Sequence, residues 1–123
     1  MTINCSGTLQ YASGYGSAAT AYGCRAWVNF DGTGTVSIRD AGNVSSITDN
    51  GTGDYTVNFS NSMPDDDFCV VGSAAIDSSS YKRVWTIKNA ALATNLVRGQ
   101  TGHSAVDSLE NEDCLIVSVA VFR

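Results

Sequence analysis

Hydrophobic and polar residues alternate with a period of two over residues 24–59, a pattern typical of strands that bury one face. The positions expected to point inward are Cys24, Ala26, Val28, Phe30, Val36, Ile38, Tyr55, Val57 and Phe59. Two glycine-containing turns, Asp31–Gly34 and Asp49–Gly53, interrupt the alternation. The pattern therefore predicts strands at 24–30, 35–39 and 54–59 that are joined by hairpin turns.

Two later segments, 68–76 and 114–122, carry apolar or small side chains on both faces. In the first, Phe68, Val70 and Ile76 alternate with Cys69, Val71 and Ala75; in the second, Leu115, Val117, Val119 and Val121 alternate with Cys114, Ile116, Ala120 and Phe122. A strand that is apolar on both faces must be covered on both. In so small a domain we expect a second sheet on one face and another subunit on the other.

Residues 83–88 predict a further strand, and residues 93–98 are a candidate for another. Short strands separated by turn signals at a spacing of roughly ten residues are typical of sandwiches and barrels. We therefore predict an all-β fold, an antiparallel β-sandwich or jelly-roll-like domain, over residues 24–123.

The first 23 residues have a different composition. Residues 5–24 carry no charge and consist almost entirely of Gly, Ser, Ala, Thr and Tyr, too few large aliphatic residues for a core of their own. Tyr11, Tyr15 and Tyr22 nevertheless supply large amphipathic rings that bind well to a partner surface. We expect residues 1–23 to form an extended arm that docks on another surface; a disordered tail is the alternative.

Composition narrows the class of protein. The chain has 123 residues, 43% of them hydrophobic and 15% charged, which indicates one domain with a packed core. A net charge of −5 argues against nucleic-acid binding, which needs a basic face. No apolar run approaches the roughly 20 residues of a membrane span. The start of the chain has no secretory signal pattern, so we expect folding in a reducing cytosol.

The four cysteines, Cys5, Cys24, Cys69 and Cys114, are far apart in the sequence. Zinc sites usually draw their thiolates from closely spaced pairs, and no such pair is present. Two disulfides with three alternative connectivities stay open. The simpler interpretation, which we favour for the last three, is that they are small buried hydrophobic residues.

Few residues of the sequence are candidates for catalysis or for metal or phosphate binding. His103 is the only imidazole, and no Gly-x-Ser-x-Gly motif marks a serine nucleophile for it. Asp65, Asp66 and Asp67 are the one dense carboxylate cluster and would suit calcium, but their spacing is not that of an EF-hand loop. The alternative is a solvated turn. The glycine turns lack the phosphate-binding pattern, so we expect no cofactor, no metal and no catalytic residue.

Two tryptophans stand on strands with polar neighbours. Trp27 alternates with Arg25 and Asn29 opposite Val28, and Trp85 lies near Tyr81 and Arg83. An aromatic ring on a polar strand face stacks on a sugar or anchors a protein interface. The alternative is that Trp27 is covered by the arm or that either ring fills the interior.

Part of the chain resembles a module of bacteriophage tail-fibre and other virion-surface proteins. The shared pattern is an ordered string of about fifty residues, at Cys24–Phe30, Ile38–Asp40, Asn43–Gly51 and Gly53–Phe59, continued by Met63–Pro64, Asp67–Phe68 and Val70–Val71. The string Cys-Arg-Ala-Trp-Val-Asn-Phe, with its rare tryptophan, is its most specific element. No catalytic residue belongs to the pattern.

The resemblance implies a homotrimeric, non-enzymatic component of the phage virion: a tail fibre, a short appendage or a capsid decoration protein. Its copies would contact one another and other capsid or tail proteins, and we select as interface candidates Tyr11, Tyr15, Tyr22, Trp27, Ile116 and Phe122. Outward loops at 65–67 and 78–82 would face solvent or host.

Two other functions stay open. The first is a host-receptor or glycan-binding module, for which the surface-binding candidates are Trp85, Tyr81 and Arg83. The second is a small polysaccharide hydrolase, with His103 and Asp66 as the residues to test. A hydrolase of this kind would need paired carboxylates that line a groove.

Overall fold

The computed structural model describes residues 7–12, 14, 16–77, 81–104 and 108–123. This part of the chain contains β1 (Gln10–Tyr11), β2 (Ala19–Thr20), β3 (Cys24–Asp31), β4 (Ser37–Gly42), β5 (Val44–Asp49), β6 (Asp54–Phe59), β7 (Cys69–Ala75), β8 (Arg83–Ala93), β9 (Leu96–Ser104), β10 (Leu109–Asn111) and β11 (Ile116–Phe122). The predicted all-β class is confirmed. No helix long and apolar enough to cross a bilayer occurs among the described residues.

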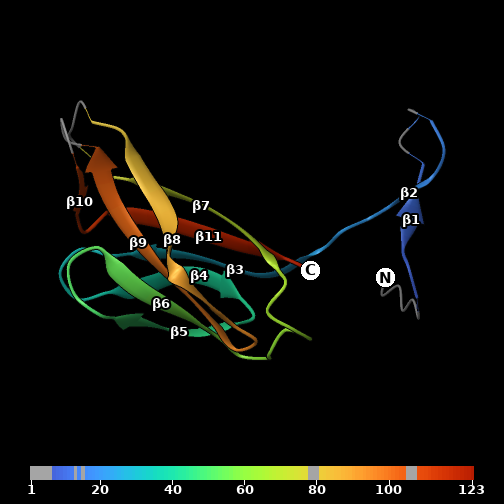
Figure 1. Cartoon of the computed structure of the whole chain (residues 1–123), viewed down its shortest axis with the longest axis horizontal. Coiled ribbons are helices and arrows are strands. Elements are labelled where there is room, and N and C mark those ends of the chain that lie inside the picture. The colour runs from blue at the N-terminus through green and yellow to red at the C-terminus, as the bar shows by residue number, and fades with distance from the viewer. Residues whose placement is uncertain (1–6, 13, 15, 78–80, 105–107) are drawn as a thin grey trace.

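Strands β4, β3, β11 and β7 form, in that order, a four-stranded antiparallel sheet, here called the β11 sheet (Figure 1). Val119 lies opposite Val28, and Ala120 lies opposite both Trp27 and Val71. Directly opposed residues share a face of an antiparallel sheet, and successive residues alternate between faces. Val28 and Val119 therefore face the interior, while Trp27, Ala120 and Val71 share the outer face.

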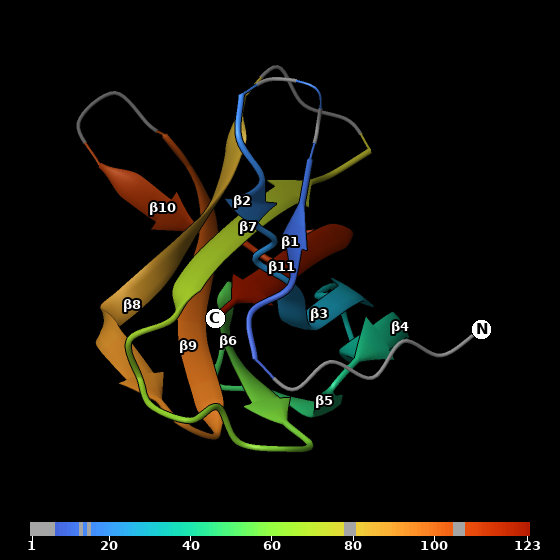
Figure 2. The ribbon, with the colours of Figure 1, turned by 90° about the vertical axis from the view of Figure 1, so that its right-hand side faces the viewer.

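Strand β9 is the centre of the second sheet, here called the β9 sheet. β8 pairs with one edge of β9, whereas β6 and β10 pair with successive parts of its other edge, and β5 follows β6. Figure 2 shows the two sheets as separate layers. The arrangement agrees with the predicted β-sandwich; the finer jelly-roll assignment stays a prediction.

The core lies between the two sheets. Its buried side chains are Ala26, Val28, Phe30, Tyr55, Val57, Phe59, Met63, Phe68, Val97, Cys114, Val117, Val119 and Val121. Phe30 of the β11 sheet meets Tyr55 of the β9 sheet edge to face, with ring centroids 5.2 Å apart. The Tyr55 hydroxyl donates to the Asp113 carboxylate at 2.7 Å, so the polar end of this buried ring is satisfied. Burial, followed by Asp113, raises the pKa of Tyr55.

An ion cluster ties three strands of the β9 sheet together. Asp54 at the start of β6 is buried and accepts hydrogen bonds from Arg98 at 2.8 and 2.9 Å and from Lys88. The Arg98 guanidinium is the largest cause that lowers the pKa of Asp54, to about 2. The cluster joins β6, β9 and β8 on the side of the sheet that faces away from the core.

Strands β1 and β2 form a two-stranded antiparallel ribbon of their own, with Gln10 opposite Thr20 and Tyr11 opposite Ala19. Figure 1 shows this ribbon set apart from the two packed sheets, beyond the C-terminal end of β11. The docking role expected for residues 1–23 stays a prediction.

The structure corrects three details of the expected burial. Cys24 and Cys69 are exposed free thiols, and only Cys114 is buried. Cys24 is the first residue of β3, where the pairing with β11 shifts register, and Cys69 is on the outer face of β7. Ile38 is 37% exposed although it pairs with the buried Phe30, because β4 is an edge strand of the β11 sheet. Cys5 lies outside the described residues.

Candidate functional site

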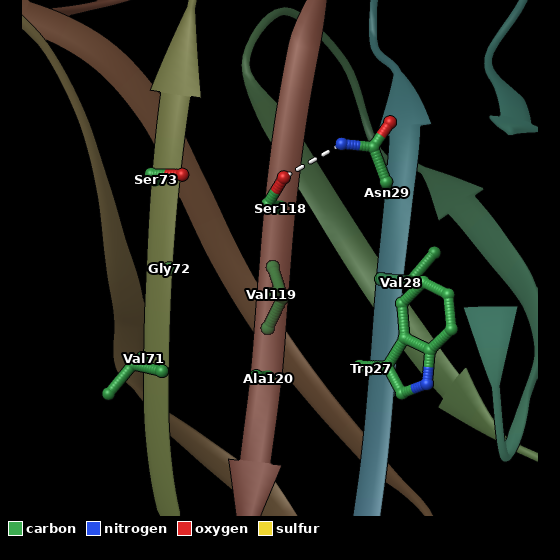
Figure 3. Close-up of a pocket in the computed structure, with 9 residues that line it drawn as sticks. All are labelled: Trp27, Val28, Asn29, Val71, Gly72, Ser73, Ser118, Val119 and Ala120. Atoms are coloured by element: carbon green, nitrogen blue, oxygen red, sulfur yellow. Dashed lines mark hydrogen bonds between the residues drawn. The ribbon is translucent and has the colours of Figure 1, made fainter. Parts of the chain in front are cut away.

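An uncharged groove of about 550 Å³ lies on the outer side of the β11 sheet (Figure 3). Strands β3, β7 and β11 each contribute three consecutive residues to its lining: Trp27, Val28 and Asn29; Val71, Gly72 and Ser73; and Ser118, Val119 and Ala120. This set is called the outer groove below. The residues come from three distant parts of the sequence and meet because β11 pairs with β3 on one side and β7 on the other.

One row of the outer groove is apolar. Val71, Ala120 and Trp27 lie side by side across three strands, and Trp27 is followed by Gly42 on β4. Val71 is 51% exposed and Trp27 is 41% exposed. A Cβ atom at Gly42 would collide with the indole nitrogen of Trp27, so the glycine is what allows this ring to lie over β4.

The neighbouring row is polar. Asn29 donates from Nδ2 to the Ser118 hydroxyl oxygen at 2.8 Å, and Ser73 lies opposite Ser118 on β7 (Figure 3). Arg39 donates to the side-chain amide oxygen Oδ1 of Asn29 at 3.5 Å and pairs with Asp31 at 3.1 Å. The row thus offers hydroxyl and amide groups in fixed positions.

The outer groove is lined by neutral side chains. Its nine lining residues include no carboxylate, imidazole, thiol, amine or guanidinium group. General acid–base or nucleophilic catalysis needs such a group, or a hydroxyl activated by one. The lining offers an aromatic face, aliphatic contact and neutral hydrogen-bonding groups instead.

Three of the predicted interface candidates lie on the outer face of the β11 sheet. Trp27 is in the outer groove, as expected from its alternation with Val28. Ile116, 43% exposed, and the half-buried Phe122 lie toward the two ends of β11 and alternate with its buried valines. Sequence reasoning did not select Val71, although it noted that the strand is apolar on both faces. The missing information was the register that sets Val71 beside Ala120.

The arm candidates are not brought to the outer groove. Tyr11 on β1 is 57% exposed, and Tyr22, just before β3, is 80% exposed. Both lie on or beside the separate β1–β2 ribbon (Figure 1). Tyr15 lies outside the described residues.

The predicted exposure of two surface-binding candidates is wrong. Trp85 packs against the core, where its ring is so close to Gly72 and Gly99 that a Cβ atom at either would collide with it. The Arg83 side chain is only 5% exposed, and its Nε lies 2.5 Å from Glu112 Oε2. Arg83 and Trp85 are two residues apart and so share a strand face, which points inward at this edge. Tyr81, by contrast, is 63% exposed.

The titratable candidates lie elsewhere and have protein partners. His103 Nδ1 is 3.1 Å from Glu112 Oε2, and its ring is 5.4 Å from that of Tyr81. Asp65 accepts from Arg123 Nε at 2.8 Å, which takes up the first carboxylate of the aspartate cluster. No group of three or more His, Cys, Asp or Glu side chains suited to a metal occurs within the residues that the structure describes.

Comparison with known proteins adds no relative: the chain matches no family model, no curated protein and no solved structure. The fold gives the class, an antiparallel all-β protein, and one of its sheets carries an uncharged groove on its outer side. The resemblance to phage virion modules stays a prediction.

Proposed function

We propose that this protein is a non-enzymatic structural module that assembles as a homotrimer on the surface of a bacteriophage particle. The resemblance supports the virion assignment, because its specific string covers β3 and continues through β6. Strand β3, with Trp27, also forms one wall of the outer groove. The segment that carries the resemblance thus includes one of the strands that line the exposed groove.

The observation that carries the proposal is the unsatisfied apolar surface on the outer side of the β11 sheet. Trp27, Val71 and Ile116 are each more than 40% exposed there, although they belong to strands whose other face is core. Val71, Ala120 and Trp27 form a continuous apolar row, and exposed apolar surface of this kind marks interaction sites in soluble proteins. A cyclic trimer covers such a face in every copy at once.

A single charge in the outer groove tests the assembly. In Val71→Glu a carboxylate would lose its hydration if copies associated, so we expect the mass in light scattering to fall from three times 12.9 kDa to that of one chain. Thr86→Glu is the matched control, because Thr86 is an exposed strand residue of the β9 sheet. A wild-type chain that is monomeric at high concentration would overturn the proposal.

The virion assignment has its own test. We expect the gene to lie among phage structural genes: neighbouring capsid genes would indicate decoration, and neighbouring tail genes a fibre or appendage. A location apart from any phage or prophage region would contradict the assignment while leaving the assembly untouched.

Glycan binding is the second candidate function. The ring that would stack on the sugar is Trp27 rather than Trp85. The outer groove sets an exposed indole beside the amide of Asn29 and the hydroxyls of Ser118 and Ser73. An aromatic platform with nearby neutral hydrogen-bonding groups suits a sugar ring. Binding to host surface polysaccharide that Trp27→Ala abolishes and Trp85→Phe retains would support this function over self-assembly.

A further inference from the structure

We propose that the β1–β2 ribbon of one copy docks in the outer groove of a neighbouring copy. The occupant is Leu9–Tyr11 and Ala19–Tyr22, the two strands of the ribbon with their flanking residues. The inference rests on the proposed homotrimer and specifies the contact that would hold it together.

The ribbon has one apolar side. Tyr11 lies opposite Ala19, and the Ala21 amide donates to the Leu9 carbonyl at 2.8 Å, which extends the same register. Paired residues share a face, so Leu9, Tyr11, Ala19 and Ala21 lie on one side, whereas Gln10 and Thr20 lie on the other. The apolar side is uncovered: Leu9 is 53% exposed and Tyr11 is 57% exposed.

An isolated two-stranded ribbon is at best marginally stable in water and needs a surface to pack on. Figure 1 shows the ribbon apart from the two sheets of its own chain. Two strands of two residues each, with an uncovered apolar side, would gain stability from a partner that packs against that side.

The outer groove matches this ribbon in chemistry. Residues 7–23 carry no charge, and neither do the nine lining residues of the groove. Docking would therefore bury no unpaired ion on either side. The apolar side of the ribbon would meet the row of Val71, Ala120 and Trp27, and its backbone and the Tyr11 hydroxyl would meet the polar row beside it. A strongly acidic or basic partner would find no counter-charge there.

The course of the chain favours a neighbouring copy over the same copy. Residues 21–23 connect the ribbon to Cys24, the first residue of β3, and the ribbon lies beyond this end of the β11 sheet (Figure 1). Trp27 lies further along β3, in the opposite direction from the ribbon. The chain would have to reverse just before β3 to cover its own groove.

The ribbon and the outer groove are different surfaces of one chain, so their contact is heterologous. Heterologous contacts close into rings when the rotation between copies allows it, whereas self-complementary surfaces give two-fold dimers. In a closed trimer every ribbon and every groove would be filled. The contact thus accounts for the open apolar face and is compatible with a ring of three copies.

Charged ribbon variants of the full chain test the contact. We expect Leu9→Glu/Tyr11→Glu to shift the mass from three chains to one, since both carboxylates fall on the apolar side. Thr8→Glu/Gln10→Glu adds the same charge to the other side of β1 and should keep the trimer. If Leu9→Glu/Tyr11→Glu stays trimeric, the ribbon contact is wrong and the proposed trimer stands; if the unmodified chain is monomeric, both fail.

Mixing two defective chains gives the sharper result. Leu9→Glu/Tyr11→Glu retains a free groove, and Val71→Glu retains a free ribbon. Each alone should be monomeric, and together they should form a one-to-one complex, since one ribbon and one groove remain and no ring closes. Absence of that complex, measured by native mass spectrometry at concentrations where the wild type is trimeric, would overturn the proposal. A monomeric wild type whose Trp27 becomes accessible only in the ribbon variant would show that the ribbon covers its own groove.

Discussion

On the outer face of the β9 sheet, polar side chains bind one another, whereas the outer face of the β11 sheet carries an open apolar row beside a polar one. Asn58 Nδ2 donates to the hydroxyls of Ser46 at 3.1 Å and Thr48 at 2.9 Å, and Asn50 Nδ2 donates to Thr56 at 2.9 Å. Across the sandwich, the corresponding positions are held by side chains such as Trp27, Val71 and Ile116.

The difference between the two faces indicates what each was selected to meet. Polar side chains that already bind one another lose little in water and gain nothing from a partner. Apolar side chains at the same depth remove surface from water only when something covers them, with a gain of roughly 25 cal/mol per Å². Solvent therefore suits the β9 face, and a protein surface suits the β11 face.

The largest expected effect separates the two tryptophans. Trp85→Ala empties a site against the core and should lower the free energy of unfolding by about 3 kcal/mol. Trp27→Ala removes a ring on the outer face and should cost about 1 kcal/mol in a single chain. Urea unfolding in the Val71→Glu background measures both, because association would otherwise add a concentration-dependent contribution. Equal losses would contradict the inner and outer placement.

The next effect concerns the ion cluster of the β9 face. Asp54→Asn would leave Arg98 and Lys88 without their carboxylate, and should cost about 2 kcal/mol, below the usual range for breaking a buried pair. The loss is moderated because the Arg98 side chain is 38% exposed, so water can solvate its guanidinium. Asp66→Asn is the control at an exposed aspartate and should change unfolding by less than about 0.5 kcal/mol. If Asp54→Asn unfolded at the same urea concentration as the wild type, the cluster would contribute nothing to stability.

The same cluster predicts a pH dependence. The pKa of Asp54 is lowered from 3.8 to about 2 in the folded state. A lowered pKa contributes stability that is fully present above the unfolded value and is lost as pH falls through the folded value. Stability should therefore fall between about pH 4 and pH 2 by about 2 kcal/mol, and Asp54→Asn should remove this part of the slope. If the stability of Asp54→Asn fell with pH as steeply as that of the wild type, the loss of stability in acid would come from other carboxylates.

Alternation predicted the core well, because burial of one strand face leaves a direct trace in the sequence. The inward assignments of Val28, Phe30, Tyr55 and Val57 are confirmed. Ile38 pairs with the buried Phe30 but is 37% exposed, because β4 is the edge strand of its sheet. Alternation therefore predicts which face a residue takes, but not whether its strand lies at the centre or the edge of the sheet.

Single residues of the outer groove could be predicted from the sequence, but their coming together in one groove could not. Trp27 and Ile116 were selected because each stands opposite core positions of its own strand. Their meeting with Val71 depends on which strands pair and in what register, and that is set by contacts between distant segments. Arg83 shows a different error: its charge predicted exposure, but its side chain is covered and pairs with Glu112, a residue distant in the sequence that follows β10.

The smallest expected effect compares one side chain from each outer face by two readouts. Asn58→Ala removes hydrogen bonds to Ser46 and Thr48 at the surface of the β9 sheet, and should cost about 0.5–1 kcal/mol with no change of assembled mass. Val71→Ala removes two methyl groups from a half-exposed site, and should change single-chain stability by less than about 0.5 kcal/mol while weakening the trimer. Asn58→Ala should thus change the free energy of unfolding but not the mass in light scattering, and Val71→Ala should do the reverse. If Asn58→Ala weakened assembly and Val71→Ala did not, the roles assigned to the two faces would be reversed.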